Sequence, residues 1–408
     1  MTNNCYPIAL CDDFLSERRN MTSRKFARKH KEETPVLAIC YDFDKTLSPD
    51  DMQAQGYIQS VGFDVGEFWT ASNGMAESND MDQNLAYMYK MMQEADGRIV
   101  FNKDKLRDYG AQVKLFPGVE AWFERIREYG REHGVIVEHY IISSGLKEMI
   151  EGTTVAKNGA FERIYASSFY FENGRSAKWP AQVVNYTNKT QFLFRIEKGV
   201  LDINDPGVND YFPPDKIRVP FRNMVYIGDS DTDIPCMKLV SSHGGHAIGV
   251  YNPETKEKDK VYKMMREKRI NYFVPSDYSE GAELDSLVKL IIDKTVATEK
   301  LERIHDKNLK ETVEVDKHSP KGEQKKIDML IELEESFSFS RTHQVIAKLS
   351  EVSDWTSDQV KRLFKIATQN SQVYSILKDD DVKLFYKGLA SKYKLRTEEY
   401  FKVIDKIN

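Results

Sequence analysis

The chain has 408 residues, of which 40% are hydrophobic and 30% are charged, and its formal net charge is -5. This length exceeds that of most single hydrophobic cores, so we expect two or three domains. The mildly acidic balance gives no electrostatic reason to expect nucleic acid as a partner, and no apolar run is long enough to predict a membrane span.

The cysteines and the first residues bear on the cellular compartment. Cys5, Cys11, Cys40 and Cys236 lie without the spacing of a disulfide framework or of a metal site. The N-terminus lacks the apolar segment of a secretion signal. Reduced thiols and no signal together predict a cytoplasmic protein.

Residues 1–34 form a basic N-terminal extension. It contains Arg18-Arg19 and then the run Arg24-Lys25-Phe26-Ala27-Arg28-Lys29-His30-Lys31. Such a run is able to bind a polyanion, but a solvated helix or an arm packed on the rest of the protein is the favoured interpretation.

Two carboxylates follow the first predicted strand, the apolar segment 36–40. Asp42 and Asp44 are separated by one residue, and Thr46 comes two residues later, before the pattern breaks at Ser48-Pro49. An ionised carboxylate at the end of a buried strand needs a cation or hydrogen-bond donors. Open α/β sheets also bind ligands beyond their strand ends. The pair therefore suggests a metal or phosphate site; the alternative is a polar turn in which Thr46 caps a helix.

Residues 50–115 have a helical pattern that is rich in aromatic residues and methionine. Its apolar positions include Met52, Tyr57, Ile58, Phe63, Phe68, Trp69, Leu85, Tyr87, Met88, Met91 and Met92. An amphipathic helical subdomain with these side chains as its core is the simplest interpretation.

Residues 116–294 alternate between helical and strand patterns, which predicts a parallel sheet built from βαβ steps. The predicted strands are 135–142, 164–171, 223–227, 247–250 and 272–274, with helices at 119–129, 189–200 and 284–292. One strand runs into Ser143-Ser144-Gly145, and another into the acidic run Gly228-Asp229-Ser230-Asp231-Thr232-Asp233. Asn173-Gly174 predicts a hairpin turn.

The character of the chain changes after residue 294. Residues 295–335 are highly charged and are expected to form a charged helical linker. Residues 336–408 are expected to form a helical accessory domain with helices at 337–349, 357–368 and 380–391. Nothing in this tail has catalytic spacing.

The order of these motifs resembles the haloacid dehalogenase superfamily of phosphotransferases over roughly residues 36–294. Within it, the phosphoserine phosphatase-like branch is the most similar, because its members carry a helical cap after the first motif and a serine-rich second motif followed by a hairpin. The resemblance implies an α/β fold: a Rossmann-like parallel sheet (35–49 and 116–294) with a helical cap insertion (50–115), to which the all-α C-terminal domain is an addition. The loop at 202–220 is longer than that branch needs, and Thr232 stands where asparagine is common.

The resemblance also implies roles for the motif residues. Asp42 would be the nucleophile and would form an aspartyl-phosphate, and Asp44 would act as general acid and base. Lys189 would neutralise charge at the phosphoryl group, although Lys178 and Lys198 stay open as alternatives. Phosphate-binding candidates are Ser143, Ser144, Gly145 and Thr46.

The acidic run would complete an oxygen-ligand Mg²⁺ site. Asp229, Asp42 and the backbone carbonyl of Asp44 would supply the ligands, and Asp233 would hold a bound water or orient Lys189. A calcium-type loop or a polar turn is the alternative, but the glycine and the terminal glutamate of an EF-hand are missing.

These expectations define three functions. The leading one is a Mg²⁺-dependent phosphatase that hydrolyses a small phosphorylated metabolite. A regulatory protein whose helical tail binds a protein partner or self-associates is the second, and a protein phosphatase or a phosphotransferase is the third. The sequence leaves the substrate and the oligomeric state open.

Overall fold

A computed structural model of the chain describes residues 26–172, 176–316 and 320–408. The predictions for Cys5, Cys11, Arg18-Arg19, Arg24-Lys25 and the Asn173-Gly174 turn lie outside these ranges. The chain divides into two compact units, the first ending at Glu299 and the second running from Lys300 to Asn408. Within the described ranges, every helix is too short or too polar to cross a membrane.

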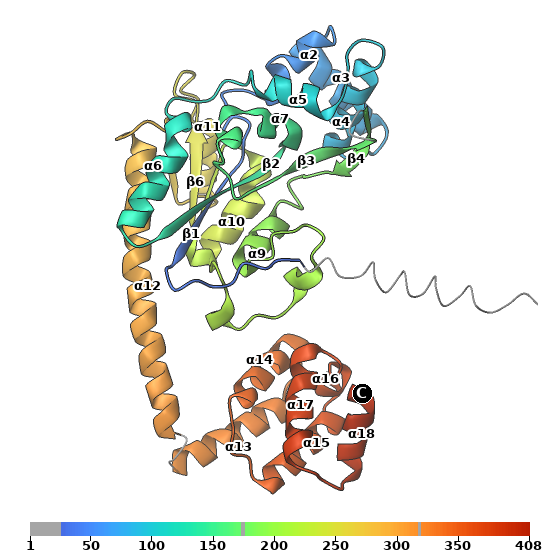
Figure 1. The fold of residues 1–408 in the computed structure, drawn as a ribbon, viewed down its shortest axis with the longest axis vertical. Coiled ribbons are helices and arrows are strands. Elements are labelled where there is room, and N and C mark those ends of the chain that lie inside the picture. Colours follow the sequence, from blue (N-terminus) through green and yellow to red (C-terminus); the bar gives the residue numbers. More distant parts are fainter. Residues whose placement is uncertain (1–25, 173–175, 317–319) are drawn as a thin grey trace, which may run out of the picture. The chain divides into compact units, whose positions relative to one another are not determined.

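The first unit contains a seven-stranded sheet with the order β4-β3-β2-β1-β5-β6-β7 (Figure 1). The strands are β1 (Val36–Tyr41), β2 (Ile136–Leu146), β3 (Arg163–Glu172), β4 (Ser176–Gln182), β5 (Met224–Gly228), β6 (His246–Tyr251) and β7 (Tyr272–Pro275). All neighbours pair in parallel except β3 and β4, which are antiparallel. The predicted parallel α/β sheet is therefore confirmed. β2 extends four residues beyond the prediction, because its polar end continues as an irregular strand with a register shift between Ser143 and Leu146.

β1 lies at the centre of the sheet and is buried along its whole length. Its side chains alternate between two hydrophobic cores, as the two-residue period of a strand requires. Leu37, Ile39 and Tyr41 belong to the core that includes residues of α6 (Val119–Glu132) and α12 (Glu283–Asp316). Cys40 belongs to the opposite core, together with α9 (Thr190–Lys198), α10 (Ile234–Ser242) and α11 (Asp259–Arg266). The sheet thus has helices on both faces.

The helical insertion predicted after β1 is present. It contains α2 (Tyr57–Ser60), α3 (Val65–Ser78), α4 (Gln83–Ala95) and α5 (Lys103–Gly110), which gather at one end of the sheet beside β3 and β4 in Figure 1. Most of its methionine and aromatic positions are core: Tyr57, Phe68, Met88 and Met91 are buried.

Helix α5 of the insertion packs tightly on α7 (Lys147–Gly152), which is followed by the short helix α8 (Thr154–Lys157). Glycines allow this approach: a Cβ added at Gly110 would overlap the carbonyl of Met149, and one at Gly152 would overlap the carbonyl of Arg107. Helix α5 therefore packs closely on α7, next to the end of β2. We call the insertion, α2 to α5, the cap.

The described part of the N-terminal extension lies against the first unit. Lys29 donates from its backbone to Gly199 and forms ion pairs with Glu138 (2.8 Å) and Glu162 (2.6 Å). Arg218 joins the same network through Glu138 at 2.7 Å. These residues thus form a packed arm.

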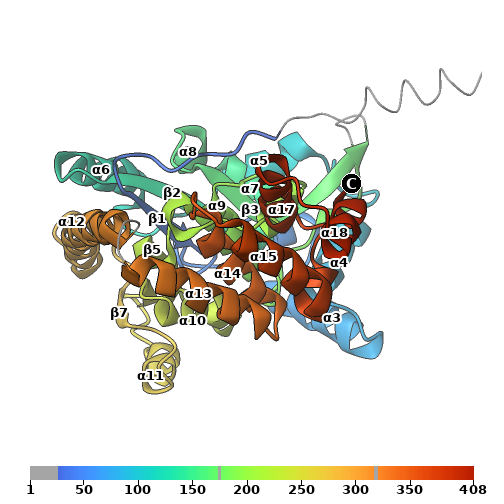
Figure 2. The ribbon, with the colours of Figure 1, turned by 90° about the horizontal axis from the view of Figure 1, so that it is seen from below.

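The second unit is entirely helical in its described residues. Its helices are the end of α12, then α13 (Pro320–Glu334), α14 (Phe339–Ser350), α15 (Ser357–Gln369), α16 (Ser371–Ser375), α17 (Asp380–Lys392) and α18 (Glu398–Ile407). Figure 2 labels all of them except α16. The helical structure expected for 295–335 is present. α12 continues from the first unit through residue 316, and α13 buries Leu330 and Leu333 in the core of the second unit. The apolar residues of α13 are sparse in a charged background, so its part in that core was not expected.

Candidate active site

The candidate site lies where three neighbouring strands end. Asp42 directly follows β1, Asp229 directly follows β5, and Ser143 lies near the end of β2. The backbone N–H of Asp42 donates to the carbonyl of Ile227 at 3.0 Å, which ties the ends of β1 and β5 together. Parallel strands bring their carboxyl ends to one edge, so residues far apart in sequence meet there.

Lys189 is the lysine that reaches this edge. Its side chain is 0% exposed, and its Nζ lies 2.8 Å from Asp233 Oδ1 and 3.3 Å from Asp42 Oδ2. Of the two alternatives, Lys178 is an exposed residue 3.9 Å from Glu172, and Lys198 donates to backbone carbonyls of the 202–220 loop. Two carboxylates compensate the buried ammonium: burial lowers its pKa, but the charges of Asp233 and Asp42 outweigh burial and raise the pKa of Lys189.

Asp233 is held from several sides. It ends the short 3-10 turn Asp231–Asp233 that follows β5, and it is 0% exposed. Besides Lys189, its carboxylate accepts from the Tyr226 hydroxyl (2.8 Å) and from the Ser230 hydroxyl (3.2 Å). Asp233 is thus held by Tyr226 and Ser230 while it contacts Lys189.

The carboxylates of the site raise one another's pKa. Burial and then the Asp233 charge raise the pKa of Asp42 to about 6, against the opposing charge of Lys189. Burial, followed by the charges of Asp233 and Asp42, raises the pKa of Asp229 to about 8. The single ammonium group of Lys189 therefore does not compensate the negative charge of Asp42, Asp229 and Asp233.

Asp42, Asp229 and Asp233 each offer a carboxylate oxygen, and the three atoms lie within 4.8 Å of one another. Among the described residues, no other set of three or more His, Cys, Asp or Glu side chains brings its ligand atoms this close together. Hard oxygen ligands with excess negative charge suit Mg²⁺. The residues present therefore fit a divalent cation. Asp42 and Asp229 accept fewer hydrogen bonds from the described residues than Asp233 does.

Asp44 lies beside this cluster, at the start of the cap segment. Its Oδ1 accepts from the backbone N–H of Met52 at 2.8 Å, and its Oδ2 lies 2.8 Å from where a Cβ of Gly145 would be. Lys45, with φ of 57°, makes the left-handed turn that separates Asp44 from Thr46. Burial, and then the charges of Asp51 and Asp42, raise the pKa of Asp44 well above its ordinary value. A carboxyl group that holds its proton can act as an acid.

The predicted phosphate-binding residues surround Asp42 and Asp44. Ser143 is buried and contacts Asp42, and its hydroxyl accepts from the backbone N–H of Gly145 at 3.1 Å. The hydroxyl oxygens of Ser144 and Thr46 are buried and have no hydrogen-bond partner among the residues that the structure describes. Gly145 has no room for a side chain, because a Cβ would meet Asp44 and Met52.

Cap helix α4 reaches the same place, which the sequence did not indicate. The hydroxyl of Tyr87 donates to the backbone carbonyl of Ser144 at 2.7 Å. Asp82 accepts from Asn185 at 2.9 Å, and Asn84 donates to the carbonyl of Val184 at 3.0 Å. Tyr87 is one of several aromatic and methionine residues at core spacing in the cap, so its position in the sequence did not distinguish it from a purely structural residue.

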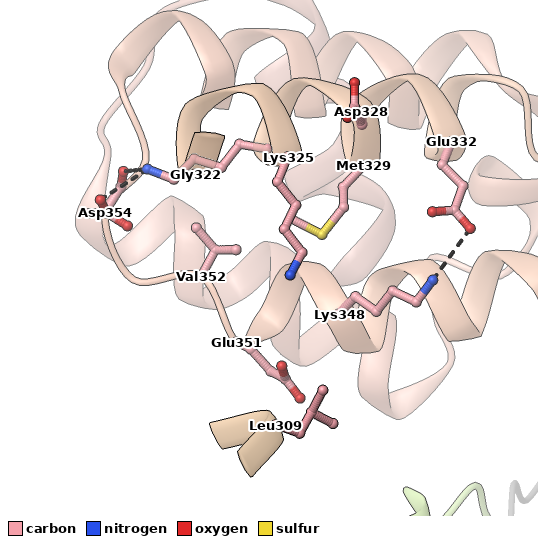
Figure 3. Close-up of a pocket in the computed structure, with 11 residues that line it drawn as sticks. Leu309, Gly322, Lys325, Asp328, Met329, Glu332, Lys348, Glu351, Val352 and Asp354 are labelled. Carbon is pink, nitrogen blue, oxygen red and sulfur yellow. Dashed lines mark hydrogen bonds and ion pairs between the residues drawn. The ribbon is translucent and has the colours of Figure 1, made fainter. Parts of the chain in front are cut away.

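The second unit contains a groove of about 430 Å³ (Figure 3). Met329 and Val352 supply its apolar part, and ion pairs of Lys348 with Glu332 and of Lys326 with Asp354 stand at its ends. The described lining of this groove contains no serine, threonine, cysteine or histidine.

Comparison with known proteins gives the family. Residues 39–238 match the haloacid dehalogenase-like hydrolases. The chain is 27% identical over 285 residues to an uncharacterized protein of Borreliella burgdorferi, covering 62% of this chain and 95% of that protein. A haloacid dehalogenase family hydrolase from Salmonella enterica serovar Typhi shares 17% identity at a TM-score of 0.42 (70% of this chain, 81% of that one). A probable phosphoserine phosphatase from Vibrio cholerae shares 13% sequence identity at a TM-score of 0.42, and the match covers 66% of this chain and 69% of that one.

Carboxylates follow the ends of β1 and β5, a buried lysine lies between them, and a helical cap is inserted after β1. The first unit belongs to the haloacid dehalogenase-like hydrolases, as the match over residues 39–238 shows. The predicted superfamily is thus confirmed over the matched residues.

Proposed function

We propose that the protein is a Mg²⁺-dependent phosphatase that hydrolyses a small phosphate monoester through an aspartyl-phosphate on Asp42. The main support is the fully buried Lys189, 3.3 Å from Asp42, next to carboxylate oxygens that gather within 4.8 Å. Isolated buried charges are costly, so such a cluster suits a site that must bind a doubly charged group and a cation.

In the first step, an oxygen of Asp42 attacks phosphorus, and the bond between phosphorus and the ester oxygen breaks. Asp44 gives its proton to the departing alkoxide, so the alcohol leaves neutral. The raised pKa of Asp44 supports this role. Lys189 and the Ser143 hydroxyl bind phosphoryl oxygens and hold the group in line with Asp42.

In the second step, water attacks the phosphorus of the aspartyl-phosphate and transfers a proton to Asp44. The bond between phosphorus and the Asp42 oxygen breaks, phosphate leaves, and both aspartates return to their starting states. Asp42, Asp229 and the backbone carbonyl of Asp44 would hold Mg²⁺, which supplies positive charge to offset the phosphoryl oxygens. Asp233 keeps Lys189 in place.

The cap favours a small substrate over a phosphoprotein. Asp42 is only 6% exposed and Lys189 is 0% exposed, so a substrate reaches them when the cap moves and must fit beneath it afterwards. The contacts of Asp82, Asn84 and Tyr87 with the sheet unit are the ones that opening breaks. The buried free thiols of Cys40 and Cys236 support a reducing compartment, which we propose is the cytoplasm.

The test is hydrolysis of phenyl phosphate by the full chain with Mg²⁺ and with EDTA. We expect turnover that EDTA abolishes and Mg²⁺ restores. Turnover that is unchanged in EDTA contradicts the metal requirement, and no turnover with Mg²⁺ contradicts the proposed phosphatase.

A further inference from the structure

Glu148 is a buried carboxylate that the proposed mechanism does not use. It is the second residue of α7, three residues after Gly145, and it is 4% exposed. Its Oε2 is buried and has no hydrogen-bond partner within the described structure. By contrast Glu151, one turn later on α7, forms an ion pair with Arg107 at 2.6 Å. A buried acceptor without a donor costs free energy, so Glu148 needs an explanation.

Two further buried polar atoms without a hydrogen-bond partner among the described residues belong to residues that contact Tyr87. The Ser144 hydroxyl is one, and the carbonyl of the same residue accepts from Tyr87. The indole N–H of Trp69 is another; its ring packs on Tyr87 with a centroid distance of 5.9 Å. The charges of both Asp44 and Glu148 act on the Tyr87 hydroxyl.

This arrangement puts the orphaned atoms on the side where the alcohol leaves. Asp44, which gives its proton to the leaving oxygen in the proposed mechanism, lies against Gly145. Ser144 directly precedes Gly145, Glu148 follows it on α7, and Trp69 belongs to cap helix α3. The alcohol part of a substrate bound at Asp42 therefore meets these groups.

The chemistry of the three atoms points to hydroxyl groups. The Oε2 atom of Glu148 lacks a hydrogen-bond donor within the described structure. Burial raises the pKa of Glu148 to about 7, although its own backbone N–H and the charges of Lys103 and Lys147 oppose this. Trp69 offers a donor and needs an acceptor, which an ammonium group does not provide. A hydroxyl both donates and accepts, so a polyhydroxylated alcohol satisfies Glu148, Ser144 and Trp69 together.

We propose that Glu148, Ser144 and Trp69 form a subsite for the alcohol part of the substrate, and that this part carries hydroxyl groups, as in a polyol or sugar phosphate. This assignment rests on the proposed phosphatase function. Glu148 is its specificity-determining residue.

The test compares full-length variants on four esters with Mg²⁺: glycerol 3-phosphate, glucose 6-phosphate, n-propyl phosphate and O-phosphoethanolamine, with phenyl phosphate as reference. For wild type, kcat/KM is expected to be at least about 10-fold higher for a hydroxyl-bearing ester than for n-propyl phosphate. Glu148→Leu is expected to lower that value by about 10- to 100-fold, as loss of a hydrogen bond to a charged group implies, while n-propyl and phenyl phosphate change less than about twofold. Glu148→Gln keeps an acceptor and is expected to stay within about fivefold.

Glu151→Gln is the matched control on the same helix and is expected to affect all esters equally. A structural role for Glu148 predicts equal losses on all esters, which overturns the subsite. A preference for O-phosphoethanolamine that Glu148→Gln abolishes overturns the hydroxyl assignment, as does wild type that does not distinguish the hydroxyl-bearing esters from n-propyl phosphate. If phenyl phosphate too is resistant, the proposed function fails and the subsite with it; if only the ester preferences fail, the phosphatase stands alone.

Discussion

Replacing Lys189 with methionine tests the electrostatic basis of the site. Methionine keeps much of the apolar stem and removes the ammonium that lies 2.8 Å from Asp233 and 3.3 Å from Asp42. Because the lysine is 0% exposed and both partners are buried, solvent cannot replace it. Removing one partner of a buried ion pair costs about 3–5 kcal/mol of unfolding free energy.

The assay is thermal unfolding in EDTA, followed by calorimetry so that the transition of the first unit is observed directly. At about 2–4 °C per kcal/mol, Lys189→Met should lower its Tm by roughly 6–20 °C. With Mg²⁺, we also expect kcat on phenyl phosphate to fall at least about 10²-fold, since a preorganised donor to the phosphoryl group is lost.

Lys178→Met is the matched control, because Lys178 is an exposed residue with a distant partner at 3.9 Å. Its effect on stability should stay within about 0.5 kcal/mol. If Lys189→Met costs less than about 1 kcal/mol in EDTA, or no more than the control does, the inferred charge balance of the site is wrong.

Three further predictions concern other parts of the chain. Burial raises the pKa of Glu138, but hydrogen bonds from Arg218 and Lys29 outweigh burial and lower it from 4.5 to about 2. The interactions of Glu138 with Arg218 and Lys29 therefore stabilise the fold fully above pH 4.5, and about 3 kcal/mol of unfolding free energy is lost as the pH falls through about 2. Urea titrations should show this extra loss in wild type but not in Glu138→Gln. Tyr87→Phe removes the donor to Ser144 and should lower kcat/KM for phenyl phosphate by about 3- to 10-fold with little change in Tm; an unchanged kcat/KM would show that the cap contact is irrelevant to the chemistry. A chain of residues 1–305 should retain kcat on phenyl phosphate within about twofold, and complete loss of activity would instead favour a catalytic or regulatory part for the helical tail.

Much of the fold follows from local pattern. The segment 36–40 is apolar throughout because β1 is buried on both faces, and this is why the first strand and the Asp42 motif were predictable. The strand ends at Ser143 and Asp229 were predictable for the same reason: apolar runs end abruptly in polar residues. Lys189 stood out only through the family resemblance, since a lysine at a helix start carries no signal of its own burial.

Other features depend on contacts between distant segments, which periodicity does not reveal. Tyr87 has the pattern of a core aromatic, and only the packing of α4 brings its hydroxyl to Ser144. Glu148 has the pattern of a surface residue on a short helix, yet α5 covers α7 and buries it. The division near residue 299 lies close to the change in composition after residue 294, but α12 crosses it as one continuous helix, which the composition did not indicate.

The central claim is that Asp42 becomes phosphorylated during turnover. The most direct measurement is mass spectrometry of full-length protein that is acid-quenched during hydrolysis of phenyl phosphate with Mg²⁺, followed by mapping of the labelled peptide. We expect one phosphoryl group on the peptide that contains Asp42 in wild type, and neither label nor turnover in Asp42→Asn, whose Tm should show that the fold is intact. A phosphoryl group on another residue, or an Asp42→Asn variant with wild-type turnover, would contradict the account.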